Sequence, residues 1–109
     1  MRICTRPSSV GDALASMRTE LQVAQTYIDH CVRQQNEGKL TSELAAIAKL
    51  FSSELEGRVV DECVQLHGGA GYMEEYEVSW RYTDARISRI YAGSSEIMRE
   101  IIARAIFGR

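Results

Sequence analysis

Residues 59–109 read VVDECVQLHGGAGYMEEYEVSWRYTDARISRIYAGSSEIMREIIARAIFGR, and this stretch decides the fold. Two glycine-containing segments interrupt it, and apolar residues recur around them at steps of three and four. Such steps place apolar side chains on one stripe of a helix. The stretch therefore predicts the end of a long helix, a turn at residues 68–71, a short helix over residues 78–90 and a last helix over residues 94–107 that ends at Gly108.

The two short helices carry apolar residues that we expect to face inward. They are Trp80, Thr83, Ile87 and Ile90 on the first, and Ile97, Ile101, Ala105 and either Met98 or Ile102 on the second.

Upstream of this stretch, the same periodicity predicts two long helices. One runs from Thr41, a good N-cap, to His67. The other runs from residue 13 to about residue 35, with Asp12 as its N-cap, and a glycine at position 38 ends it. On the later helix, Glu54 and Arg58 are four residues apart and are expected to pair. Residues 1–12 lack an apolar period and are expected to form an unstructured leader.

These elements predict an all-α, up-down helical bundle of four helices, two long and two short, over residues 13–109. No segment alternates with the period of two that a half-buried strand requires. Each helix has an apolar stripe that must pack against another helix. Because the two short helices cannot cover the long pair completely, we expect dimers or higher homo-oligomers.

Composition argues against several classes of function. The chain holds 13 Lys and Arg against 15 Asp and Glu, a net charge of −2, so no basic surface for nucleic acid is indicated. Its apolar stretches are far shorter than the roughly 20 residues that span a bilayer. Three widely spaced cysteines without a Cys/His ligand pattern predict no metal site and reduced thiols, as in a cytoplasmic protein.

Two segments could carry chemistry, and the residues alone leave both open. The glycines of residues 65–71 would let a backbone or a phosphate approach. They follow a helix, however, whereas phosphate-binding glycines precede one, so a structural turn is the alternative. Gly93 and Ser94 open a helix, and its first-turn amides either meet a ligand or belong to an ordinary cap.

Taken together, the two segments resemble the C-terminal signature of acyl-CoA dehydrogenases. That signature has a Q-x-H/L-G-G-x-G-Y run, an acidic connection, an R-D-A-R-I-type helix, a Y-E-G-T-x-E-type turn and a last amphipathic helix. The resemblance covers residues 59–109 strongly and residues 13–37 more weakly. It implies that the chain is most of the family's C-terminal four-helix bundle, without the first helix of that bundle.

The resemblance also implies a cofactor and its contacts. In the family, FAD lies between subunits, and the glycine run contacts the adenosine-diphosphate part of a neighbour's flavin. The corresponding residues here are Gln65, Gly68 and Gly69, with His67 adjacent. The turn before the last helix borders the flavin and the acyl-CoA thioester, which implies Ser94 and Glu96 for FAD, and Tyr91 and Gly93 along the acyl pocket.

One departure from the family pattern bears on activity. Ala92 stands where much of the family has the glutamate that removes the α-proton of acyl-CoA, and a methyl group cannot accept a proton. A small residue there resembles the isovaleryl- and long-chain-type branch, which keeps the base on the preceding helix of the bundle. The resemblance therefore implies an oxidoreductase of fatty acid metabolism, and we expect the isolated chain to be inactive.

Two other hypotheses remain open. The chain could be a non-enzymatic helical oligomerisation module, or one subunit of a split flavoenzyme that a partner chain completes.

Overall fold

The computed structural model describes residues 7–108, which form helices and no strand. The predicted all-α class is therefore confirmed, as is the division into two long and two short helices. None of the helices in this range is both long and apolar enough to cross a membrane. In chain order the elements are α1 (Pro7–Asn36), α2 (Ser42–His67), α3 (Gly69–Tyr72), α4 (Glu77–Arg86), the 3-10 helix η1 (Ile87–Arg89) and α5 (Ser95–Phe107).

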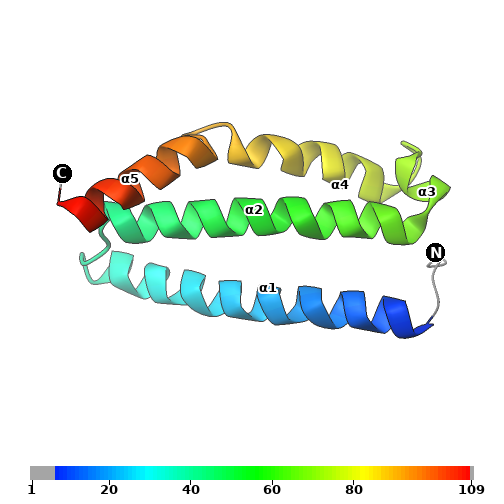
Figure 1. Cartoon of the computed structure of the whole chain (residues 1–109), viewed down its shortest axis with the longest axis horizontal. Helices are drawn as coiled ribbons and strands as arrows, with labels where there is room; N and C mark the ends of the chain where they lie inside the picture. The colour runs from blue at the N-terminus through cyan, green and yellow to red at the C-terminus, as the bar shows by residue number, and fades with distance from the viewer. Residues whose placement is uncertain (1–6, 109) are drawn as a thin grey trace.

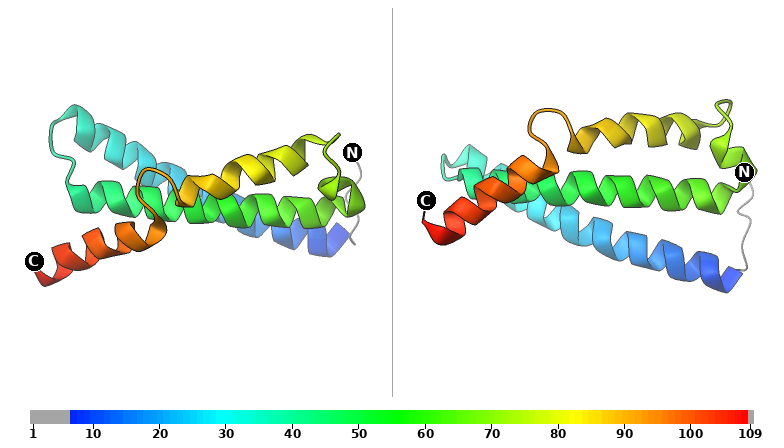
Figure 2. Two further views of the ribbon diagram at one scale, coloured as in Figure 1. Left: turned by 90° about the horizontal axis from the view of Figure 1, so that it is seen from above. Right: turned by 45° about the horizontal axis from the view of Figure 1, so that its top comes forward.

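The central element is α2, and the other helices pack along it (Figure 1). α1 runs antiparallel to α2 on one side, and α4 followed by α5 returns along the other side. Figure 2 shows that α4 and α5 follow one another, with a bend between them. The up-down arrangement is as predicted, but the two short helices share one position in the bundle.

The first helix begins earlier than the sequence pattern predicted. α1 starts at Pro7, so residues 7–12 are helical and do not belong to a leader. Asp12 lies inside the helix and is not its N-cap. Proline is accepted in a first helical turn because its missing amide would have no partner there, and a helix tolerates Gly11 at a cost of about 1 kcal/mol. Residues 1–6 of the predicted leader lie outside the described residues.

The predicted signals are confirmed at three helix ends. Thr41 caps α2, because the backbone amide of Leu44 donates to Thr41 Oγ1 at 3.1 Å. Gly38 follows α1 with φ +71°, and Gly108 ends α5 with φ +71°. Glycine is favoured at such left-handed helix exits because it has no Cβ to clash with the backbone.

The core is thin and lies along α2. The predicted inward stripe of the third helix is wrong, because Trp80 is 49% and Ile90 is 51% exposed, and Thr83 and Ile87 are exposed too. Both short helices contact α2 along one face, and no helix within residues 7–108 packs closely over their other faces. The buried apolar residues are Ala24, Cys31, Ala46, Leu55, Leu66, Ala85 and Met98, so on α5 Met98 is buried, whereas Ile97 and Ala105 are exposed.

Ion pairs connect α2 to the helices on both sides of it. The expected pair within α2 is not formed, since Arg58 reaches α1 and pairs with Glu20 at 3.0 Å. Glu54 instead pairs with Arg89 at 3.7 Å and with Arg99 at 3.6 Å. Long side chains can bridge to a neighbouring helix as readily as along their own, and an i,i+4 pair contributes only about 0.2–0.5 kcal/mol.

Candidate functional site

The turn before α5 is held by a lysine from α2. Lys49 Nζ donates a hydrogen bond to the carbonyl oxygen of Tyr91 at 2.9 Å and a second one to the carbonyl oxygen of Gly93. Lys49 was not predicted as a site residue from the sequence, because a single lysine on a helix is usually solvated. The available signal was its position inside an otherwise apolar run, residues 44–51.

Two residues of the turn that Lys49 holds have left-handed backbone conformations. Ala92 has φ +53° and Gly93 has φ +100°. The left-handed conformation costs a residue with a Cβ roughly 1–2 kcal/mol, and the two bonds from Lys49 on either side of Ala92 offset this cost. At Gly93, an added Cβ would lie 2.6 Å from Cε of Met98. Because Cε is the flexible end of the Met98 side chain, glycine is required at position 93 mainly by its φ of +100°, which is strained for any residue with a Cβ.

Ser94 caps α5, which is one of the two alternatives that the sequence left open for the start of this helix. The amide of Ile97 donates to Ser94 Oγ at 3.4 Å, and the amide of Met98 donates to the Ser94 carbonyl at 2.9 Å. Hydrogen bonds from its own backbone amide and from the Ser94 hydroxyl hold the pKa of the exposed Glu96 carboxyl below its usual range. Glu96 is therefore a weaker proton acceptor than an ordinary glutamate.

Ser95, which the sequence analysis did not single out, has an unusual hydroxyl. The residue is 5% exposed, and its Oγ is the one buried side-chain polar atom without a hydrogen-bond partner in the described part of the chain. Leaving a buried hydroxyl unpaired costs about 1–3 kcal/mol, so such an atom calls for an explanation. Ser95 lies between Ser94 and Glu96, the two residues expected to contact the flavin.

The glycine run is not a plain turn, because it forms the short helix α3. Gly68 ends α2 with φ +64°. A Cβ at Gly69 would meet no atom within 4 Å, whereas a Cβ at Gly71 would lie 2.5 Å from the carbonyl oxygen of Val64. The close approach of two backbones is thus at Gly71, and Gly69 leaves open space in which a ligand could lie.

Two other residues of this segment are at the end of α2. His67 Nδ1 lies 2.6 Å from the carbonyl oxygen of Cys63, so the ring donates from Nδ1 and leaves Nε2 available. Gln65 is exposed in the last turn of the helix. No group of three or more His, Cys, Asp or Glu side chains within the described residues could hold a metal ion.

The two candidate segments lie far apart in one chain. Gly68 is nineteen residues beyond Lys49 on α2, which corresponds to roughly 28 Å at 1.5 Å per residue. Figure 1 shows the glycine run at the C-terminal end of α2, whereas α5 begins beside the N-terminal half of α2. At this separation the two segments of one chain do not border a common cleft.

The N-cap of α5 gives a direct test of the geometry at this site. We expect Ser94→Ala to lower the free energy of unfolding by about 1 kcal/mol, because the Ile97 amide loses its acceptor. Urea unfolding followed by circular dichroism measures this loss. Ser16→Ala, at an exposed position within α1, is the control. A Ser94→Ala change no larger than that of the control would show that the cap contributes nothing.

Comparisons with known proteins find relatives of this chain both by sequence and by helical fold. A family model described as acyl-CoA dehydrogenase, C-terminal domain, matches residues 6–107. The long-chain specific mitochondrial acyl-CoA dehydrogenase of Mus musculus is 45% identical over 98 residues, which are 90% of this chain and 23% of the mouse protein.

Solved structures show the same relation. An acyl-CoA dehydrogenase from Geobacillus kaustophilus superimposes with a TM-score of 0.89 at 42% identity, over 91% of this chain and 26% of that one. Butyryl-CoA dehydrogenase from Megasphaera elsdenii gives a TM-score of 0.89 at 34% identity, over 94% and 27% of the two chains. The chain thus spans about a quarter of the length of the relatives that it matches.

Proposed function

Because this chain belongs to the acyl-CoA dehydrogenase family, as its C-terminal helical domain, we propose that it supplies two separate parts of flavin-binding surface, one to each of two flavins. The observation that carries the proposal is the start of α5. There Lys49 fixes the preceding turn, and the buried Ser95 hydroxyl has no partner within the described residues. An unpaired donor beside a helix N-terminus suits a polar ligand.

The first part of the surface is the turn and the first residues of α5. Here Ser94 and Glu96 would contact FAD, and Tyr91 and Gly93 would lie along the acyl part of a thioester. Tyr91 is 58% exposed, so its ring is free to cover a ligand. Family members are FAD flavoproteins, and the bound flavin would supply the hydride acceptor for α,β-dehydrogenation of an acyl-CoA.

The second part of the surface is the end of α2. Gln65, Gly68 and Gly69, with His67 adjacent, would contact the adenosine-diphosphate part of a flavin held mainly by a second copy. The open space at Gly69 supports this role. The separation of roughly 28 Å along α2 supports the need for two copies, as a homo-oligomer would provide.

The residues of the turn supply no proton acceptor. Ala92 ends in a methyl group, and the hydrogen bonds to Glu96 weaken that carboxylate as a base. We therefore expect a dye-reduction assay of the chain alone, with a panel of acyl-CoA thioesters, to show no turnover. Turnover above the rate without protein would contradict this part of the proposal.

Flavin binding is tested by sedimentation in the presence of FAD. We expect the flavin absorbance to sediment only with species of two or more chains. Gly69→Val should reduce bound FAD several-fold, because its side chain would fill the open space without changing the core. Gly11→Val, within α1, is the control for a valine placed at a helical glycine. Flavin that sediments with the monomer, or that binds Gly69→Val unchanged, would disprove the two-copy site.

A second candidate function is that of a helical oligomerisation module that binds no flavin. It is favoured by large apolar side chains on the outer faces, such as Val23 on α1, which is 60% exposed, and Phe107 on α5, which is 73% exposed. Sedimentation at several protein concentrations without FAD measures self-association, and a compact monomer at all concentrations would exclude this function.

The free thiols of Cys31 and Cys63 support a reducing compartment, for which we propose the cytoplasm.

A further inference from the structure

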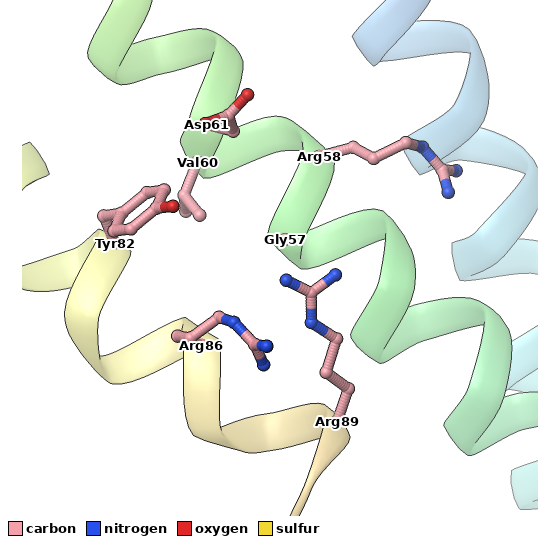
Figure 3. Close-up of a pocket in the computed structure, with 7 residues that line it drawn as sticks. All are labelled: Gly57, Arg58, Val60, Asp61, Tyr82, Arg86 and Arg89. Carbon is pink, nitrogen blue, oxygen red and sulfur yellow. The ribbon is translucent and has the colours of Figure 1, made fainter. Parts of the chain in front are cut away.

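A small pocket lies between α2 and the α4–η1 segment, apart from the residues assigned to flavin or thioester. Its volume is about 190 Å³. Figure 3 shows the residues that line it, which are Gly57, Arg58, Val60, Asp61, Tyr82, Arg86 and Arg89. Three of these seven residues are arginines, and one is acidic.

Two of the arginines reach into the space from the same side. Arg86 at the end of α4 and Arg89 in η1 both extend toward α2 (Figure 3). Gly57 makes room for the second of them, because a Cβ at that position would lie 3.3 Å from Nη1 of Arg89. Arg58 points away toward α1, where it pairs with Glu20.

The positive charge of this pair is only weakly compensated. Glu54 pairs with Arg89 at 3.7 Å and is shared with Arg99 at 3.6 Å. Both distances exceed the roughly 2.7–2.9 Å of a strong charge-assisted hydrogen bond. In the described part of the chain, neither Arg86 nor Asp61 has an ion pair. Arg86 thus has no paired counter-charge and Arg89 shares one carboxylate at a long distance, so the two guanidinium groups repel each other and an anion between them would reduce that cost.

We propose that this pocket binds a phosphate group. A guanidinium presents N–H donors in a planar fork that matches phosphate oxygens. Near neutral pH one phosphate group carries about two negative charges, so it would pair with Arg86 and add to the weak compensation of Arg89 by Glu54, whereas a carboxylate carries only one. Val60 provides an apolar wall, and the Tyr82 hydroxyl provides a further donor. The phosphate is either free inorganic phosphate or the phosphate of a larger organic ester.

The test is a titration of the chain with sodium phosphate at ionic strength held constant with sodium chloride. NMR follows the Gly57 amide and the Nε–H signals of the pocket arginines, which we expect to shift and saturate. Arg86→Gln should weaken binding at least tenfold. Arg33→Gln, an exposed arginine near the end of α1, should change it less than twofold. Shifts that never saturate, or equal weakening by both variants, would overturn the proposal.

A second variant is expected to change the phosphate affinity in the opposite direction, which excludes misfolding as the explanation of the result. Asp61→Asn removes the negative charge at the pocket and should tighten phosphate binding several-fold, a gain that a misfolded protein would not give. Weaker binding by this variant would contradict the proposal. Titration with adenosine monophosphate separates the two sources: equal affinity identifies the phosphate group alone as the ligand, and affinity at least tenfold higher identifies a larger phosphate ester.

Discussion

Replacing Gly71 by alanine is expected to lower the free energy of unfolding by about 2–4 kcal/mol. This loss is larger than that of an ordinary substitution, because the added Cβ would overpack a tight contact. The added Cβ would lie 2.5 Å from the carbonyl oxygen of Val64 and 3.1 Å from both the Val64 Cα and the His67 Cβ. Two of these three atoms belong to the backbone of α2, so no side-chain rotation can relieve the clash. α3 would have to move away from α2.

Gly69 is the matched control, two residues away in the same short helix. A Cβ there meets no atom within 4 Å, so Gly69→Ala should change stability by less than about 0.5 kcal/mol, as surface substitutions usually do. Urea unfolding followed by circular dichroism at 222 nm compares the two variants. Equal midpoints would mean that α3 does not pack against α2 as described.

The second large effect is expected at Lys49. Lys49→Met keeps most of the length of the side chain but removes both hydrogen bonds to the carbonyl oxygens of Tyr91 and Gly93. A hydrogen bond to a charged group contributes about 1.5–3 kcal/mol. Because the site is only partly buried, we expect a total loss of about 2 kcal/mol, together with faster amide exchange in the first turn of α5.

The chain offers a natural control for this variant, because Lys39 is its only other lysine. Lys39 is exposed and, among residues 7–108, pairs only with Glu37, at 3.6 Å, so Lys39→Met should change stability by less than about 0.5 kcal/mol. Lys49→Arg should restore part of the lost protection from exchange. If exchange near Ser95 is the same in Lys49→Met as in the unchanged chain, the lysine does not hold the turn.

Local signals were enough to predict most of the elements from the sequence. The ends of α2 and α5 follow from Thr41, Ser94 and Gly108, whose cap interactions involve residues at most four positions away. The start of α1 was misjudged because Pro7 and Gly11 usually mark irregular chain, and here both lie within a helix. Propensity is a weak guide where neighbouring residues favour the helix.

The candidate site was less predictable, because its geometry depends on contacts between distant residues. Lys49 meets a turn more than forty residues further along the chain, and no local pattern encodes that contact. The buried state of the Ser95 hydroxyl likewise depends on packing. The inward face of α4 and part of that of α5 were misassigned, whereas Met98 is buried as predicted. An apolar stripe shows which face of a helix needs to be covered, but it does not show whether the described residues cover it.

The central place of α2 has a consequence for the order in which the protein acquires structure during translation. Within residues 7–108, α1 is synthesised before its packing partner α2, and isolated helices are marginal in water. The contact between α1 and α2 can therefore form only when α2 has emerged. From that point α4 and α5 dock onto a helix that already exists, so residues 77–107 fold against α2 as they are made.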